Sequence, residues 1–371
     1  MHNVAQDLGA GHQAGPRQAT PERRQSSARK LKKWGALREK TQMTTTMTRR
    51  GFNVAVAALA ITCGIAPAFP QSYPSKAITI VVPFPPGGAS DITARAVAAT
   101  LEPALGQPVV IENKPGANGG IGAAFVKQAK PDGYTLLVGS IGVYAINPVL
   151  YPKLQYDPAK DFDLLTVAVR TPNVLVASTQ FAPSSVSELI AQMKKTPGTV
   201  TFASSGAGSS DHLTAALFWQ RTGTSGLHVP YKGGGPAITD LIGGHANVSF
   251  QNLGAVSNHI KAGKLKLLAV ASDKRTTEFP DAPTLAEAGV SGVEVFSWQA
   301  VAAPKGLPSD VKTKLEAAVI AAVKNPATDK RLSDIGFQIV GNSSAQFGEF
   351  LNAEIARWRE IVTVGKITID Q

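Results

Sequence analysis

The residues best suited to chemistry lie in glycine- and serine-rich turns that follow apolar runs. The first turn, residues 85–91 (PPGGASD), follows the β-branched run 78–84 and precedes apolar residues at helical spacing up to Gly106. A strand that passes through glycines into a helix directs free backbone N–H groups and the positive end of the helix dipole to one point. This arrangement suits a phosphate or a carboxylate, although a plain strand-to-helix turn has the same pattern. The nucleotide-binding patterns G-x-x-x-x-G-K-[ST] and G-x-G-x-x-G are absent.

A second turn of this kind occupies residues 204–212 (SSGAGSSDH), between a predicted strand at 199–203 and a predicted helix. Ser209, Asp211 and His212 are the residue types of a hydrolytic relay, but neighbours along a helix point apart and cannot form one. The hydrolase pattern G-x-S-x-G is absent, and the histidines lack the H-x-x-x-H spacing of metal ligands. The sequence therefore predicts no catalytic residue, no metal site and no cofactor.

Predicted strands and helices alternate along the chain around these turns. Strands are predicted at 109–112 and 134–138, with another glycine-rich turn at 113–120 between them. This alternation is typical of a parallel sheet with right-handed crossovers. Ligands of such sheets bind beyond the carboxyl ends of the strands, so we expect the loops at 85–91, 113–120 and 139–142 at one binding edge.

The same order of elements is repeated after a proline-rich connection at 147–163. The second unit begins with a capping box at residues 185–188 (SVSE), which predicts a helix through Lys195. Further short strands are predicted at 227–230, 248–250 and 265–271. The chain therefore predicts two α/β units.

Two extended segments are predicted to cross between the units. The first, 164–178, is interrupted by Pro172, and the second, 293–303, is apolar except for Ser297 and Gln299. Two α/β domains joined by two crossing segments are the geometry of a hinged solute receptor.

The positive charge of the chain is concentrated at its start. Residues 1–50 contain eleven Lys and Arg against three Asp and Glu, which accounts for +8 of the net charge of +11. The remainder carries no basic stripe with interleaved aromatic residues, so we expect no nucleic-acid partner. Cys63 is the only cysteine, and a mature chain that starts after it has neither a disulfide nor thiol chemistry.

The start of the chain has the features of an export leader. Residues 1–42 are polar and basic without hydrophobic period, which indicates a misassigned extension. Arg49-Arg50, the apolar run 52–65 and the small-residue site Ala66-Pro67-Ala68 then follow the order of a signal peptide. The sequence thus predicts a leader at 1–68 and export to the periplasm, by the Sec or the twin-arginine route.

The turns and strands described above resemble one known family. The stretches that carry the resemblance span about residues 73–371: YPSKAITIVVPFPPGGASD, GQPVVIENKPGANGGIGA, PDGYTLLVGS, FASSGAGSSDHL, HVPYKGGGPAITDLIGGHANVSF, HIKAGKLKLLAVASDKR and FPDAPTLAEAG. They are similar to the Bug (TctC-type) family of extracytoplasmic solute receptors, which serve tripartite tricarboxylate transporters. Together these stretches are specific, although no single one is.

The resemblance implies that the turns at 85–91 and 204–212 face each other across a cleft. They are expected to hold a ligand carboxylate through backbone N–H groups, hydroxyl groups and ordered water. The residues expected to bind the ligand are Gly87, Gly88, Ala89 and Asp91 in the first turn, and Ser204, Ser205, Gly206 and Ser209 in the second. Asp91 can equally serve only as a cap of its helix.

Three further residues are candidates for ligand binding. Ser140 follows the third strand, and His212 begins a helix beside the second turn, where it either donates to an acidic ligand or is satisfied within the fold. The family often has Phe-Asp-Asn where this chain reads Phe250-Gln251-Asn252. A neutral amide in place of a carboxylate disfavours a ligand with an ammonium group, which points to a plain organic or aromatic acid.

The resemblance therefore predicts an α/β, two-domain periplasmic-binding-protein fold (type II-like), with parallel-type sheets flanked by helices and the ligand cleft between the domains. Domain 1 is expected to contain residues 69–174 and 298–371, and domain 2 residues 175–297. The predicted function is capture of a small organic acid and its delivery, as a monomer, to the membrane subunits of a tripartite tricarboxylate transporter. The alternatives are a sensor that signals to a membrane kinase and a hydrolase or transferase that uses the two turns.

Overall fold

The computed structural model describes residues 73–365 and 367–368. This part of the chain belongs to one compact unit. The predicted leader at 1–68, with its cleavage site, lies outside the described residues. None of the helices in the described range is both long enough and apolar enough to span a membrane.

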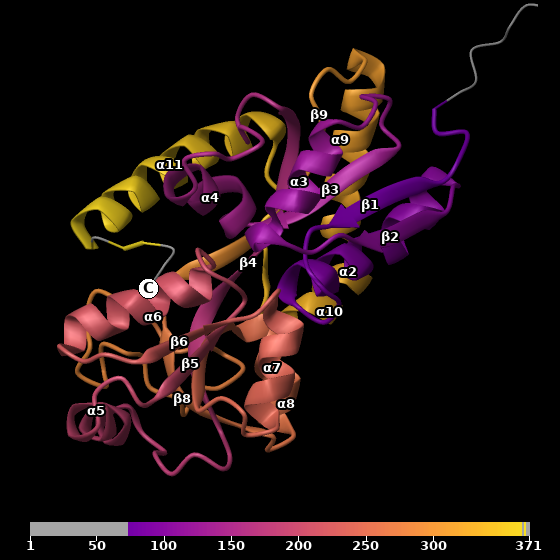
Figure 1. Cartoon of the computed structure of the whole chain (residues 1–371). Helices are drawn as coiled ribbons and strands as arrows, with labels where there is room; N and C mark the ends of the chain where they lie inside the picture. Colours follow the sequence, from indigo (N-terminus) through magenta and orange to yellow (C-terminus); the bar gives the residue numbers. More distant parts are fainter. Residues whose placement is uncertain (1–72, 366, 369–371) are drawn as a thin grey trace, which may run out of the picture. The chain divides into compact units, whose positions relative to one another are not determined.

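Two parallel groups of strands form the two ends of a mixed sheet (Figure 1). The first group has the order β2-β1-β3 and contains β1 (Ile78–Val82), β2 (Val109–Asn113) and β3 (Thr135–Ser140). The second has the order β7-β5-β6 and contains β5 (Thr201–Ser204), β6 (Leu227–Pro230) and β7 (Val248–Asn252). The predicted parallel pairing is confirmed within each group.

Two long antiparallel strands connect the groups. β9 (Phe296–Pro304) pairs with β3, and β4 (Phe162–Ser178) pairs with β9 and then with β7. Two further strands, β8 (Leu265–Ala271) and β10 (Gln338–Ile339), also pair with β4. The predicted crossing segments are therefore neighbours that pair with each other.

Helices accompany both groups of strands, as Figure 1 shows. The helices beside the first group are α2 (Ala89–Leu105), α3 (Gly120–Lys127), α4 (Asn147–Leu150), α9 (Ser309–Val323), α10 (Pro326–Ser333) and α11 (Ser344–Gly365), with the short turns η2 (Ala117–Gly119) and η3 (Gly142–Ile146). The helices beside the second group are α5 (Val186–Lys195), α6 (Ser210–Thr222), α7 (Gly234–Ile242) and α8 (Leu253–Lys261). The predicted capping box is confirmed, because the Ser185 side chain accepts from the Glu188 N–H at 3.2 Å.

Separate hydrophobic clusters stabilise the two groups. The first is formed by β1, β3 and β9 with apolar faces of α2, α9 and α11. The other two lie on opposite faces of the second group, because alternate residues of β4 point to opposite sides: Leu175 belongs to one cluster, and Val174 and Val176 to the other.

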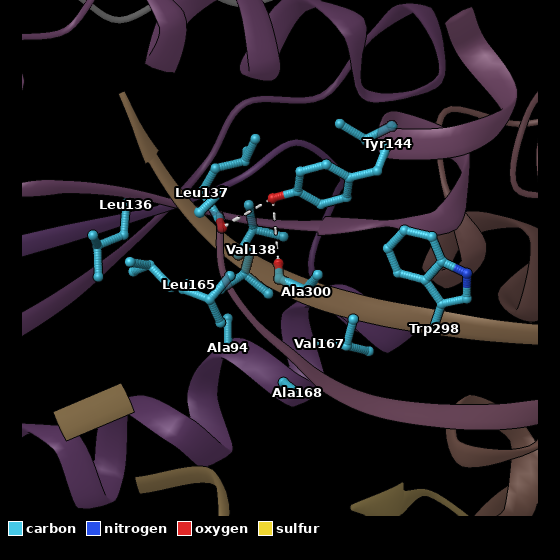
Figure 2. Close-up of a cluster of buried hydrophobic side chains, with 14 of the residues drawn as sticks. Ala94, Leu136, Leu137, Val138, Tyr144, Leu165, Val167, Ala168, Trp298 and Ala300 are labelled. Atoms are coloured by element: carbon cyan, nitrogen blue, oxygen red, sulfur yellow. Dashed lines mark hydrogen bonds between the residues drawn. The ribbon is translucent and has the colours of Figure 1, made fainter. Parts of the chain in front are cut away.

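Tyr144 lies in the first cluster (Figure 2). Its ring stacks on Trp298 at a centroid distance of 5.9 Å, and its hydroxyl donates to the carbonyl oxygens of Leu137 and Ala300, at 3.5 and 3.4 Å. Both carbonyls belong to the paired strands β3 and β9. This tyrosine therefore satisfies its buried hydroxyl while it packs against the sheet.

The predicted interruption at Pro172 is wrong. β4 runs through this residue without a break, with Pro172 opposite Phe296 of β9. Immediately beyond it, the Asn173 N–H donates to the Val295 carbonyl at 2.9 Å, and β4 takes β7 and β8 as partners. The missing N–H of proline is tolerated because it falls where the strand changes partners.

Residues 142–150 are helical, although the sequence predicts a loop and a connection there. The turn of η3 is fully buried, and Asn147 anchors α4 by donating to the Asn118 carbonyl at 3.0 Å and to the Tyr156 hydroxyl at 3.1 Å. These partners are distant in sequence or buried, so local periodicity does not indicate them.

Asp163 fastens the start of β4 to the loop after β9. Its buried carboxylate accepts from the N–H groups of Gly306 and Leu307 at 2.8 and 2.9 Å, and from the ammonium group of Lys305 at 3.2 Å. Burial acts to raise the pKa of this carboxyl, but the bonds from Leu307, Gly306 and Lys305 outweigh it and lower the pKa below its ordinary value.

We expect Asp163→Ala to lower the free energy of unfolding by about 3 kcal/mol at pH 7, because the buried N–H of Leu307 and the partly buried N–H of Gly306 lose a charged acceptor. A lowered carboxyl pKa stabilises the fold above the unfolded value of about 4, and this contribution is lost as pH falls through the folded value. The difference from wild type should therefore shrink at pH 3. Urea unfolding at both pH values measures it.

The matched control for this change is Asp334→Ala. Asp334 is exposed and pairs only with the exposed Lys330, so its loss should change stability by less than about 0.5 kcal/mol. An equal loss of stability at pH 3 and pH 7 in Asp163→Ala would contradict a role for the ionised carboxylate.

Candidate functional site

The first predicted turn leads from β1 to the N-terminus of α2. Gly87 has a φ of +88°, which favours glycine, whereas Gly88 is extended with a φ of −84° and is the N-cap residue. The Asp91 carboxylate accepts from the Gly87 N–H at 3.1 Å, from Arg95 at 2.9 Å and from Asn113 at 3.1 Å. Burial acts to raise the pKa of Asp91, but these bonds lower it on balance. Asp91 therefore holds the turn in place.

The second predicted turn leads from β5 to the N-terminus of α6. The N-cap residue Ser209 accepts from the His212 N–H at 3.2 Å. Asp211 accepts from the Ser205 N–H at 3.1 Å and also from the Ser205 hydroxyl. Burial raises the pKa of the Asp211 carboxyl to about 6, although the bonds from Ser205 and Ser210 act in the opposite direction.

Two histidines support the second turn. The Ser204 hydroxyl lies 2.7 Å from His228 Nε2, and the Gly206 N–H donates to the Ser204 hydroxyl at 3.2 Å. The Gly208 N–H donates to His212 Nδ1 at 3.1 Å, and the ring of His212 stacks on that of His228 at 4.0 Å between centroids. His212 thus has a structural role in the fold.

A cavity lies where the two turns meet the ends of β3, β7 and β9. Its lining comprises Phe84, Gly88, Ala89, Ser90, Asn118, Ser140, Ser205, Ser209, Ser210, Asp211, Gly234, Gln251, Asn252, Ala255, Ser297 and Gln299. The volume that the centre of a water molecule can occupy is about 40 Å³, which is room for about three waters or one carboxylate group.

Four helices of the described chain begin at this cavity. The N-cap residues of α2, α6 and α8 (Gly88, Ser209 and Asn252) line it, as does Gly234, the first residue of α7. The first N–H groups of a helix have no partner within the helix, and the helix dipole places about half a positive charge there. The cavity therefore favours an anion.

The polar side chains of the lining bond to each other or to polar side chains just behind the lining, without using cations. The Ser90 hydroxyl donates to Gln299 Oε1 at 2.6 Å, and Gln251 Nε2 donates to the Ser249 hydroxyl at 2.9 Å. Asn118 Nδ2 donates to Asn147 Oδ1 at 2.9 Å, while its own Oδ1 has no hydrogen-bond partner among the described residues. In the described part of the chain no lysine or arginine lines the cavity, so hydroxyl, amide and backbone donors must recognise a ligand.

The turns at 85–88 and 233–235 touch each other beside the cavity. A β-carbon placed on Gly235 would lie 2.3 Å from the Pro86 carbonyl oxygen, and one on Gly88 would lie 3.7 Å from the Gly234 nitrogen. The backbones therefore leave no room for a β-carbon on Gly235, whereas one on Gly88 would make an ordinary van der Waals contact. This contact connects the first strand group with the second.

The predicted ligand-binding residues divide into two sets by position. Those that line the cavity are Gly88, Ala89, Ser140, Ser205, Ser209 and Gln251. Those outside its lining are Gly87, Asp91, Ser204, Gly206 and His212, and each of these bonds within or beside one of the two turns. Ligand binding by either set remains a prediction.

The lining also contains residues that the sequence analysis does not select. Ser297 and Gln299 are the two polar residues of an otherwise apolar strand, and residues two apart share a face, so this spacing is a usable signal. Asn118 belongs to the glycine-rich turn expected at the binding edge, and Asn252 follows Gln251 at the end of β7. Gly234 has no such signal, because only the tertiary fold brings it to the first turn.

Comparison with known proteins gives one consistent family. The family profile described as "Tripartite tricarboxylate transporter family receptor" matches residues 93–366. Protein BugT of Bordetella pertussis (strain Tohama I) is 39% identical over 303 residues, which cover 81% of this chain and 93% of BugT.

Solved structures agree in both sequence and fold. R. palustris Rpa4515 with adipate is 37% identical with a TM-score of 0.77, covering 80% of this chain and 99% of that chain. MatC (Rpa3494) from Rhodopseudomonas palustris with bound malate is 33% identical with a TM-score of 0.75, covering 78% of this chain and 100% of that chain. The mixed α/β architecture described above is therefore that of periplasmic binding proteins.

Proposed function

The chain belongs to the family of tripartite tricarboxylate transporter receptors, and we propose that it binds a small organic carboxylate in the cavity between its two strand groups. Proteins of this family are periplasmic solute-binding receptors rather than enzymes. We propose that this chain passes its ligand, as a monomer, to the membrane subunits of such a transporter. We also propose that residues 1–68 are its export leader.

The observation that carries this proposal is the convergence of four helix N-termini on a cavity to which the described residues contribute no lysine or arginine. A carboxylate accepts several hydrogen bonds, and small residues such as Gly88 and Ala89 let the backbone approach it closely. Each hydrogen bond to a charged group contributes about 1.5–3 kcal/mol. Fixed backbone donors therefore supply affinity without the desolvation of a buried cation.

The relatives support the class of ligand. Two similar solved structures, Rpa4515 with adipate and MatC with bound malate, contain dicarboxylates. In this chain the buried Gln251 contributes a neutral amide to the lining, which is compatible with a plain acid. We propose that the ligand is a mono- or dicarboxylate without an ammonium group.

The domain division is also part of the proposal. We place domain 1 at 69–174 and 298–371 and domain 2 at 175–297, with β4 and β9 as the hinge between them. The separate hydrophobic clusters of the two strand groups support this division. The turns at 85–88 and 233–235 are in contact in this structure, and we propose that this contact belongs to the form that is closed over the ligand about β4 and β9, and that the turns separate when the protein opens.

We expect thermal unfolding to detect the ligand class. Adipate, malate, succinate, citrate and benzoate are tested, with glutamate as the ammonium-bearing control and adipamide as the uncharged control. A ligand at 100 times its Kd stabilises the folded state by about 2.7 kcal/mol, which is a rise of roughly 5 °C in Tm. Calorimetric titration then gives the stoichiometry. If no carboxylate raises Tm, or if adipamide does so equally, the proposed function is wrong.

A further inference from the structure

Within residues 73–365 and 367–368, Asp211 is the one carboxylic acid that lines the cavity. It is 2% exposed. Its Oδ2 accepts from both the N–H and the hydroxyl of Ser205, whereas Oδ1 accepts from the Ser210 hydroxyl at the longer distance of 3.2 Å. A site that we propose for carboxylates thus contains a buried carboxyl group with one lightly used oxygen.

No cation neutralises this group among the described residues. Asp211 takes part in no ion pair, and the other residues that line the cavity are uncharged. Across the cavity, the nearest acid on α2 is Asp91, which is already paired with Arg95 at 2.9 Å. Along its own helix the next titratable residue is His212, whose ring stacks on His228 of β6.

The elements that pack on α6 supply no counter-ion either. They include β4, β5, β7 and α11, and also β6, whose His228 stacks on His212. β5 and β7 carry no titratable side chain. The charged groups of β4 and α11 bond elsewhere or are exposed: Asp163 to Lys305, Arg170 to Gln338, Glu354 to Arg357, and Glu349, Arg359 and Glu360 at the surface. Burial without a cation raises the pKa of Asp211 to about 6.

We propose that Asp211 takes up one proton from solvent when a carboxylate ligand enters the cavity, and that the neutral acid then donates a hydrogen bond to the ligand. This inference rests on the proposed function. Two carboxylates in one water-poor site cannot both remain ionised, so one of them binds a proton. The proton goes to Oδ1, because Oδ2 already accepts two hydrogen bonds. The only new covalent bond is this O–H bond.

This role makes affinity depend on pH with a definite sign. Above the pKa of Asp211 in the free protein, each bound ligand must bring in a proton from solvent. Affinity should therefore fall as pH rises above about 6, by up to tenfold per pH unit until the pKa of the complex is reached. The opposite arrangement, an ionised Asp211 that binds an ammonium group, would instead favour amino acids and would need no proton.

The test is calorimetric titration of the whole chain with adipate and malate between pH 5.5 and 8.5. At pH 7 these probes are ionised, so the observed heat in buffers of different ionisation enthalpy reports protons bound by the protein. We expect an uptake of about 0.5–1 proton per ligand at pH 7. In Asp211→Asn the amide replaces the neutral acid, so proton uptake and the pH slope should disappear while binding at pH 8 is retained or strengthened.

Asp240→Asn is the matched control. Asp240 lies on α7, accepts from the Tyr231 hydroxyl at 2.7 Å and does not line the cavity, so this variant should keep the proton uptake of wild type. Wild type that binds adipate or malate without proton uptake would refute the inference, as would uptake that persists in Asp211→Asn. If that variant does not fold, the proton count of wild type alone decides. If no carboxylate binds wild type even at pH 5.5, the proposed function fails and this inference fails with it.

Discussion

Replacement of Gly235 by alanine is expected to lower the affinity for a carboxylate ligand about tenfold to a hundredfold while the protein stays folded. The new β-carbon would lie 2.3 Å from the Pro86 carbonyl oxygen. Both groups belong to backbones, so neither can move aside as a flexible side chain does. Overpacking of this kind costs about 1–3 kcal/mol, which corresponds to this loss of affinity if the contact forms only in the closed state.

The thermal stability of the unliganded Gly235→Ala protein should not fall with its affinity. Gly235 is the second residue of α7, where alanine is the better helix former by up to about 1 kcal/mol. In the open, unliganded form that we propose, the turns are apart, so the unliganded variant should unfold at the same temperature as wild type or slightly higher. Calorimetric titration beside thermal melts measures both quantities, and small-angle scattering should show less compaction of the variant with ligand.

Gly348→Ala provides the control for this pair of effects. Gly348 lies within α11, and a β-carbon there meets no heavy atom within 4 Å. It should keep the affinity of wild type and gain a similar increment of helix stability. Near-native affinity in a folded Gly235→Ala protein would show that the contact between the turns is not part of the ligand-bound state.

Local pattern was enough to predict most elements of this fold. The β-branched run of β1, the glycine turn and the following helix have distinct local signals, and the capping box at Ser185 fixes the start of α5. The parallel pairing within each group follows from the alternation of strands and helices. The strand through Pro172 was missed because the cost of a proline depends on which ladder bonds that position must make, and these are known only from the partners.

Only part of the site could be predicted from the sequence. The glycine- and serine-rich composition of residues 85–91 and 204–212 indicates the two turns, and six predicted residues line the cavity. Which face of each turn is open to a ligand depends on bonds such as those of Asp91 to Arg95 and Ser204 to His228. The approach of Gly234 to the first turn depends on β4 and β9, which bring together segments far apart in the chain.

Gln251 and Asp211 together determine the charge expected at the site. Gln251 has a neutral amide where the resemblance leads us to expect an aspartate, which by itself predicts a site without negative charge. The structure places the buried carboxyl of Asp211 in the same lining. The charge of the site therefore depends on the protonation of Asp211, and a sequence comparison at position 251 alone does not indicate it.

Replacement of Trp298 by alanine should produce the largest loss of stability, about 4 kcal/mol. Trp298 is 2% exposed, and its ring stacks on Tyr144 and meets the edge of Phe350 at a centroid distance of 5.2 Å (Figure 2 shows the tryptophan beside Tyr144). Its Nε1 donates to Glu354 Oε2 at 2.9 Å. Alanine would leave a cavity between β9 and α11 and remove this donor from a buried carboxylate.

Trp298→Phe separates the two contributions. It keeps an aromatic ring in the cluster but cannot donate to Glu354, so its cost should be about 1–2 kcal/mol. Phe125→Ala is the exposed aromatic control, because Phe125 is 44% exposed, and it should cost less than about 1 kcal/mol. Urea unfolding measures all three variants.

Trp298→Ala also tests whether the packing of β9 supports the cavity. Ser297 and Gln299 flank Trp298 and line the cavity from the opposite face of the strand. If packing of Trp298 only stabilises the fold, folded Trp298→Ala should bind its carboxylate within about threefold of wild type at low temperature. A loss of less than about 1.5 kcal/mol in the free energy of unfolding would contradict the expected void between β9 and α11, because truncating a well-packed buried tryptophan destabilises a fold by more than this.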